Sequence, residues 1–155
     1  MKEELRILII EDSEDDTLLI LHQIKKGGFN IDYVRVETSE TMKSALEKNK
    51  WDIILSDFQL PKFNGLEALK LLKESGLDLP FIIVSGTIGE EVAVGAMKAG
   101  AHDYIMKNNL KRLLPAIERE LREAQNRAER KQAEESLRES EEKYRLIAEN
   151  TADTI

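Results

Sequence analysis

Short apolar runs alternate with segments of helical spacing along the first 113 residues. The runs are rich in β-branched residues, as buried strands are. They predict five strands, at residues 5–10, 31–36, 53–56, 81–84 and 103–106. Between these runs, apolar residues recur every three or four positions, which is the spacing of one helix face. Strands that alternate with helices in this way predict an α/β fold, with a parallel sheet covered on both faces.

Glycines mark the ends of the predicted helices. Gly27-Gly28, Gly76 and Gly100 follow the first, third and fourth helical segments. Glycine is favoured just past a helix C-terminus because it has no Cβ to oppose the left-handed conformation. The second segment, residues 41–48, has a weaker apolar side, and we expect a short helix there.

Charged and polar residues follow the predicted strands directly. Glu11 and Asp12 come after the first strand, Asp57 after the third, Ser85 after the fourth and Lys107 after the fifth. Because the carboxyl ends of parallel strands meet at one edge of a sheet, we expect these side chains to surround one cleft. Clustered carboxylates repel one another, and a hard cation such as Mg²⁺ relieves that repulsion. Such a site is suited to phosphoryl transfer onto a carboxylate.

Each of these residues also has a simpler interpretation when it is taken alone. An acidic residue after a strand is usually a helix cap or part of a solvated loop, and Asp15 and Asp16 would favour the positive end of the first helix. An aromatic residue in a strand, such as Tyr104, is usually part of the core. Because suitable polar residues follow four of the five strands at once, the functional interpretation is favoured over the simpler ones.

Composition excludes several classes of function. With 155 residues, the chain has room for one ordinary domain and an appendage. A net charge of −7 argues against nonspecific binding to nucleic acids. The absence of cysteine excludes disulfides and thiolate chemistry, and it fits a cytoplasmic location. The only apolar run near the start, residues 7–10, is too short for a secretion signal or a membrane span.

The composition changes after residue 113. From Leu114 onward there is no glycine and Glu, Arg and Ala dominate, which predicts a long helix. Apolar residues with heptad spacing predict that this helix forms a dimer and relays the signal. These residues are Leu114, Ile117, Leu121, Ala124 and Ala128. A second stretch from Ala133 to residue 147 repeats the spacing after a break near Lys131. A solvated single helix is the alternative.

Four segments resemble the receiver domains of two-component response regulators, over about residues 5–115. They are ILIIEDSEDD, ILSDFQLPKFNGLEAL, IIVSGTIGEE and AMKAGAHDYIMK, and their order and spacing together are specific. The resemblance implies a doubly wound, flavodoxin-like sheet with strand order 2-1-3-4-5. It also implies that a histidine kinase or phosphotransfer protein phosphorylates the domain in the presence of Mg²⁺.

The same resemblance assigns roles to individual residues. Asp57 is the implied phosphoacceptor. The implied metal ligands are Glu11, Asp12, Asp57 and the Gln59 backbone carbonyl. The phosphate-binding pair is Ser85 and Lys107, and the switch pair is Ser85 and Tyr104. Asn108 stands where the family usually has a proline in a cis peptide, so we expect the loop after Lys107 to differ in shape.

The last residues, SEEKYRLIAENTADTI, resemble the opening helix of PAS domains. We therefore expect a receiver domain at 1–113, a helical linker or coiled coil at 114–143 and the start of a PAS-like domain at 144–155. This arrangement is similar to the front half of hybrid sensor histidine kinases.

The expected function is a phosphoacceptor switch, relayed through the C-terminal helix of a homodimer to a downstream sensory or kinase module. We expect no conventional enzyme activity, nucleic-acid binding or membrane segment in this part of the protein. Two alternatives stay open. One is a static dimerisation module with a vestigial acidic pocket. The other is an Asp-nucleophile phosphatase of the haloacid-dehalogenase type, which typically carries its aspartates after the first strand rather than the third.

Overall fold

The computed structural model describes residues 3–86 and 89–153. Its elements alternate as predicted. In chain order they are β1 (Glu4–Ile10), α1 (Glu14–Lys25), β2 (Asn30–Val36), α2 (Ser39–Lys48), β3 (Ile53–Ser56), α3 (Gly65–Ser75), β4 (Phe81–Ser85), α4 (Glu90–Ala99), β5 (Asp103–Met106), the 3₁₀ segment η1 (Lys107–Arg112) and α5 (Leu113–Asp153). The expected α/β class is confirmed.

The five strands form one parallel sheet in the order β2-β1-β3-β4-β5, which confirms the expected topology. Ile10 pairs with Val36 on one side and with Ser56 on the other, and Ser56 pairs with Ile83. Across the last pair of strands, Ser85 lies opposite Met106. The residues that follow these positions therefore emerge along one carboxyl edge of the sheet.

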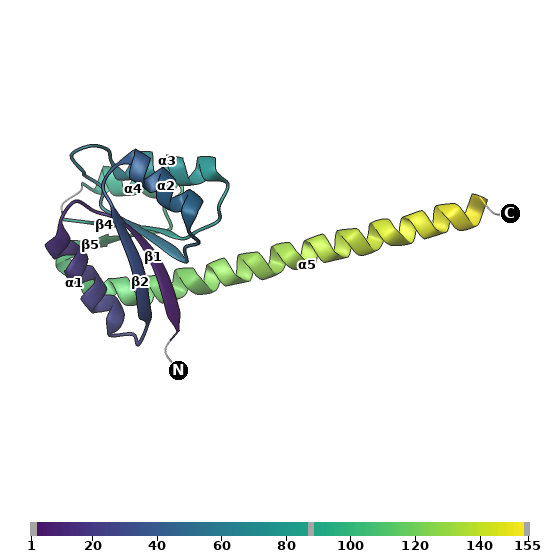
Figure 1. Ribbon diagram of the computed structural model, residues 1–155, viewed down its shortest axis with the longest axis horizontal. Coiled ribbons are helices and arrows are strands. Elements are labelled where there is room, and N and C mark those ends of the chain that lie inside the picture. The colour runs from purple at the N-terminus through teal and green to yellow at the C-terminus, as the bar shows by residue number, and fades with distance from the viewer. Residues whose placement is uncertain (1–2, 87–88, 154–155) are drawn as a thin grey trace. The chain divides into compact units, whose positions relative to one another are not determined.

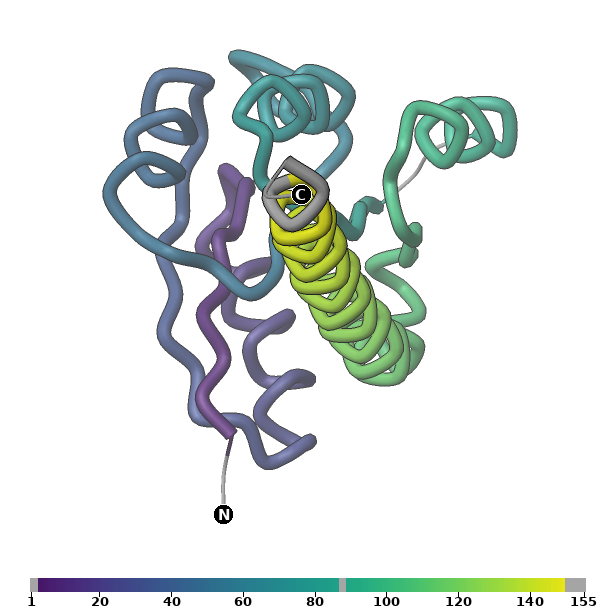
Figure 2. Tube along the Cα trace, turned by 90° about the vertical axis from the view of Figure 1, so that its right-hand side faces the viewer, coloured from purple at the N-terminus to yellow at the C-terminus, as the bar shows by residue number. Residues whose placement is uncertain are grey.

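Helices cover both faces of the sheet, and each face has its own core (Figure 1). On one face, α2, α3 and α4 pack on strand residues such as Leu8, Ile54 and Ile83. On the other, α1 and the beginning of α5 pack on Ile9 and Leu55. Figure 2 shows the same layers from a second direction. Residues 81–85 are buried without interruption, as a strand covered on both faces requires.

Side chains and glycines define the helix ends. The Ser13 hydroxyl accepts a hydrogen bond from the Asp16 N–H and caps α1, and Asn64 caps α3 in the same way through the Glu67 N–H. Gly76 follows α3 with a φ of 76° and Gly100 follows α4 with a φ of 117°. These positive values confirm that both glycines end their helices in the left-handed conformation.

The first turns of α5 belong to the core of the α/β domain. Pro115 is the third residue of the helix, a position where its missing N–H costs nothing. Leu113, Ala116 and Ile117 are buried against the sheet, and Ile117 is fully inaccessible to solvent. Assigning Ile117 to a dimer seam was therefore wrong. Its apolar side chain faces the core of its own domain because the helix still covers the sheet at that point.

The residues from Arg122 onward form a separate unit. It consists of the rest of α5, and every side chain from 128 to 149 is exposed. Leu137, Tyr144 and Ile147 are among these exposed side chains. The expected PAS-like start extends to residues 154–155, outside the described part. Within the part that is described, no helix combines the length and the apolar character needed to cross a bilayer.

Candidate functional site

The carboxyl edge of the sheet carries the predicted polar residues, and hydrogen bonds fix the backbone there. The Glu11 N–H donates to the Val36 carbonyl at 3.1 Å, and the Asp57 N–H donates to the Ile10 carbonyl at 2.8 Å. Both bonds extend the parallel ladder by one residue beyond the strand ends. The carboxylates of Glu11 and Asp57 are thus anchored to a rigid edge.

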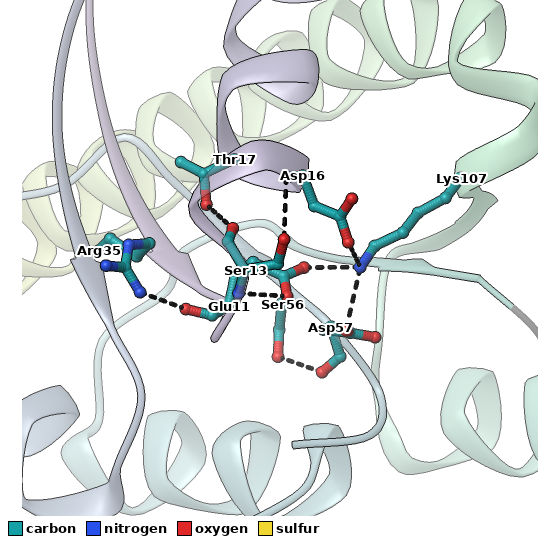
Figure 3. Close-up of polar contacts among 8 residues, drawn as sticks. All are labelled: Glu11, Ser13, Asp16, Thr17, Arg35, Ser56, Asp57 and Lys107. Atoms are coloured by element: carbon teal, nitrogen blue, oxygen red, sulfur yellow. Dashed lines mark hydrogen bonds and ion pairs between the residues drawn. The ribbon is translucent and has the colours of Figure 1, made fainter. Parts of the chain in front are cut away.

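Lys107 lies at the centre of the site, where its ammonium group contacts three carboxylates (Figure 3). Nζ donates to Glu11 Oε2 at 2.8 Å, to Asp57 Oδ2 at 3.0 Å and to Asp16 Oδ2 at 2.8 Å. The residue follows β5 directly and begins η1. The structure therefore brings together three predicted residues, Glu11, Asp57 and Lys107, which are far apart in the sequence.

Asp16 is a member of this cluster that the sequence interpretation missed. It lies in the first turn of α1, where its carboxylate was expected only to favour the positive end of the helix. The sequence carries no separate signal for this contact, because Asp12 precedes the helix and Asp16 lies within its first turn. The carboxylate in fact forms an ion pair with Lys107.

Glu11 is held in place from several directions. Glu11 is only 1% exposed to solvent. The Ser13 N–H donates to Glu11 Oε1 at 3.1 Å, and Arg35 Nη1 donates to the Glu11 carbonyl at 3.2 Å. This buried acid is therefore oriented by the start of α1 as well as by Lys107.

The electrostatics of the site shift two groups. Burial raises the pKa of the Glu11 carboxyl to about 7, and the Asp57 carboxylate adds to that rise. Hydrogen bonds from Lys107 and the Ser13 N–H act in the opposite direction without cancelling it. For Lys107, burial opposes the charged form, but the bonds to Asp16, Glu11 and Asp57 outweigh it and raise the pKa of the ammonium above its ordinary value.

The acidic residues fit a divalent cation. Glu11, Asp12 and Asp57 each offer a carboxylate oxygen, and these atoms lie within 4.8 Å of one another. Two oxygens on opposite sides of one Mg²⁺ ion are about 4.2 Å apart, so the cluster is close to the size of a single coordination shell. Oxygen-only ligands with few carboxylates are typical of Mg²⁺. The group is therefore able to hold such an ion.

The loop from Asp57 to α3 closes tightly under the site. The Ser56 hydroxyl donates to the Asp57 carbonyl at 2.8 Å, and the Gly65 N–H donates to the Phe58 carbonyl at 2.9 Å. A Cβ at Gly65 would lie 3.1 Å from the Asp57 carbonyl oxygen and 3.2 Å from Phe58 Cα. Glycine at this position thus lets α3 start directly beside the backbone of Asp57.

The remaining predicted residues lie around the cluster rather than in its ion-pair network. Ser85 is buried at the end of β4, next to Met106 in the sheet register. Tyr104 is half-buried in β5, and its hydroxyl donates to Met106 Sδ. Gln59 is exposed and forms an isolated bridge with Asn64. Asp12, exposed beside Glu11, joins the cluster through the carboxylate group described above.

The loop after Lys107 has a regular form despite the missing proline. Asn108 is the second residue of the 3₁₀ segment η1, in which only Asn109 departs from helical angles, with φ −138° and ψ 52°. None of the peptide bonds in the described residues is cis. A trans bond before Asn108 is consistent with the high cost of a cis bond at a residue other than proline.

Comparisons of the sequence with known proteins point to one family. The family model of the response regulator receiver domain matches residues 7–118. The protein PhoP of Bacillus subtilis (strain 168), an alkaline phosphatase synthesis transcriptional regulatory protein, is 29% identical over 102 residues, which are 66% of this chain and 42% of PhoP. The cell cycle response regulator CtrA of Brucella ovis is 34% identical over 106 residues, 66% of this chain and 44% of CtrA. The chain thus spans less than half the length of these relatives.

A solved structure agrees with the sequence matches. The signal receiver domain of a LuxO repressor protein from Vibrio parahaemolyticus superposes with a TM-score of 0.72 and 25% sequence identity. The match covers 81% of this chain and 95% of that domain. With the family model matching most of its length, the chain belongs to the response regulator receiver domains of two-component signalling.

Proposed function

We propose that Asp57 accepts a phosphoryl group from the phosphohistidine of a partner histidine kinase or phosphotransfer protein. Receiver domains accept phosphoryl groups on an aspartate. The observation that carries the choice of Asp57 is its position at the end of β3, where its carboxylate meets Lys107 at 3.0 Å and lies beside Glu11 and Asp12. A nucleophile surrounded by a cation and a metal-binding acid pair is what this transfer requires.

In the proposed reaction, a carboxylate oxygen of Asp57 attacks phosphorus and forms a new P–O bond. The P–N bond of the donor breaks, and its electron pair goes to an imidazole that is neutral because its other nitrogen holds a proton. Lys107, whose raised pKa keeps it charged, donates hydrogen bonds to the phosphoryl oxygens. Ser85 supplies a second donor from the end of the neighbouring strand.

The residues that would hold Mg²⁺ are Glu11, Asp12, Asp57 and the Gln59 backbone carbonyl. A bound ion neutralises charge on the phosphoryl oxygens and reduces repulsion between the donor and the acidic site. The convergence of three carboxylates within 4.8 Å supports Glu11, Asp12 and Asp57 as ligands, and the Gln59 carbonyl is proposed from the family resemblance alone. Glu11 and Asp57 would then serve both the ion and Lys107, whose ammonium contacts both carboxylates.

We further propose that phosphorylation is relayed through α5. The phosphoryl group draws Ser85 toward it, and Tyr104 turns inward, which alters the face formed by α4, β5 and α5. Because Leu113 and Ala116 are packed in the receiver core, a change there acts directly on the first turns of this helix. The signal would then reach a PAS-like or kinase module in a larger, dimeric protein.

The proposal is tested by incubating the protein with acetyl phosphate and Mg²⁺ and measuring its intact mass. We expect the mass of one added phosphoryl group in the wild type and none in Asp57→Asn. Labelling of Asp57→Asn to the wild-type level would refute the assignment. Sustained hydrolysis of a phosphomonoester would instead support the phosphatase alternative, and a protein that stays unlabelled would support a vestigial pocket.

A further inference from the structure

All three N–H donors of the Lys107 ammonium are engaged in hydrogen bonds. An ammonium group has three N–H donors, and here Glu11, Asp57 and Asp16 each accept one at 2.8–3.0 Å. The Lys107 side chain is 19% exposed, so solvent has little access to the group. A phosphoryl oxygen can therefore gain a bond from Lys107 only when one of these three carboxylates gives up its own.

The three partners differ in what happens to them during the proposed reaction. Glu11 and Asp57 belong to the group of convergent carboxylates that fits a metal ion. A carboxylate oxygen of Asp57 also forms the new bond to phosphorus. Among the described residues, that group comprises Glu11, Asp12 and Asp57, without Asp16. Asp16 is thus the partner of Lys107 whose carboxylate neither metal binding nor phosphorylation engages.

The backbone of Asp16 is fixed by its neighbours. Its N–H donates to the Ser13 hydroxyl, which fixes the first turn of α1. The helix is anchored to the sheet through Ile20, Leu21 and Ile24, all buried. Figure 3 shows the Asp16 carboxylate reaching from this helix to one side of the Lys107 nitrogen, with Asp57 on another.

We propose that Asp16 is a positioning residue that keeps the Lys107 ammonium beside Asp57 while the metal and the phosphoryl group occupy the other carboxylates. The inference rests on the proposed function of Asp57 and adds a residue to it. Without Asp16, Lys107 would keep its long, flexible side chain but lose the one contact that persists through the transfer, so fewer molecules would hold the ammonium in a productive place.

The test compares Asp16→Asn with Asp15→Asn. Both changes remove one negative charge from the first turn of α1, so they affect the helix and the local field alike. With acetyl phosphate and saturating Mg²⁺, we expect Asp16→Asn to be phosphorylated about fivefold more slowly than Asp15→Asn, the factor expected for the loss of one partly exposed ion pair. The affinity for Mg²⁺, measured without the phosphodonor, should differ by less than about twofold, because Asp16 lies outside the metal group. Equal rates, or a faster Asp16→Asn, would overturn the proposal.

A second measurement reads the position of Lys107 directly. This measurement uses the protein bound to Mg²⁺ and beryllofluoride. The Lys107 ammonium protons should exchange slowly with water in the wild type and in Asp15→Asn, which gives a sharp ¹H–¹⁵N signal. In Asp16→Asn they should exchange faster and broaden that signal. Equal protection in all three proteins would contradict the role of Asp16 whatever the rates are. If the wild type itself takes up no phosphoryl group, the proposed function fails; if it does and the two variants match, only the role of Asp16 fails.

Discussion

Glu11 carries an ionisable carboxyl in a place that is almost closed to water. Burial favours its neutral form, and the nearby Asp57 carboxylate does the same, so the pKa of Glu11 is raised to about 7. Lys107 offsets part of this cost by bonding to Glu11 Oε2. The site is therefore under electrostatic strain when no metal is bound, and this has a measurable consequence for stability.

In metal-free buffer, we expect the wild type to lose stability relative to Glu11→Gln as the pH rises. The native state keeps the Glu11 proton up to about pH 7, whereas the unfolded chain releases it near 4.5. The contribution of Glu11 is complete below pH 4.5 and is lost as the pH approaches 7, with a total change on the order of 3 kcal/mol. Urea unfolding with EDTA at several pH values between 4.5 and 8 measures the difference. Parallel curves for the two proteins would contradict this account.

Gly65 gives a second test at the level of one side chain. An added Cβ would press on the backbone of Asp57 and Phe58, which is less able to move than a side chain. We expect Gly65→Ala to lower the free energy of unfolding by about 1–3 kcal/mol and to slow phosphorylation of Asp57. The matched control is Gly95→Ala in α4, where an added Cβ meets open space. That control should raise the stability by up to about 1 kcal/mol; equal losses in both variants would be evidence against the close approach at Gly65.

Most residues of the ion-pair cluster could be predicted because strand ends in a parallel sheet converge. Glu11, Asp57 and Lys107 were found in this way. Asp16 was not, because an aspartate in the first turn of a helix already has an explanation in the helix dipole. Only coordinates could show that its carboxylate reaches Lys107 rather than solvent.

Among the elements, α5 combines two roles that look the same in the sequence. Leu113, Ala116 and Ile117 pack in the receiver core, whereas Leu137, Tyr144 and Ile147 are exposed on the same helix. A heptad seam and the core face of a single helix have nearly equal periods, 3.5 and 3.6 residues, so five positions cannot separate them. The strands were easier to place, because β-branched runs between glycines and charges leave few alternatives.

We therefore expect two apolar truncations in α5 to have different effects. Ile117→Ala should lower the free energy of unfolding of the receiver domain by about 2–5 kcal/mol, because it leaves a cavity under the sheet. Leu137→Ala, at a side chain that is 60% exposed, should leave that stability unchanged.

The second truncation should instead weaken dimerisation, if the seam from Ala133 to residue 147 joins two copies of the chain. Urea unfolding and sedimentation velocity separate the two effects. If Ile117→Ala weakened dimerisation and left the free energy of unfolding unchanged, Ile117 would belong to the dimer seam after all.

At the level of the complete chain, the protein combines a receiver unit and a helical unit. The receiver unit holds every residue of the proposed site, and its two cores lie on opposite faces of one sheet. The acidic cluster and the start of α5 are built on the same strands, so a change at the site can bias the packing of that helix. This arrangement fits a switch better than a static dimerisation module, because a purely structural unit would have no use for a buried, charged cluster.

The most direct test of the account is to locate the phosphoryl group on the chain. The protein is treated with acetyl phosphate and Mg²⁺, the acyl phosphate is reduced with borohydride, and the resulting homoserine is located by tandem mass spectrometry of peptides. We predict homoserine at position 57, and none when Mg²⁺ is removed by EDTA. Homoserine at Asp12 or at another acidic residue, with Asp57 unmodified, would contradict the account.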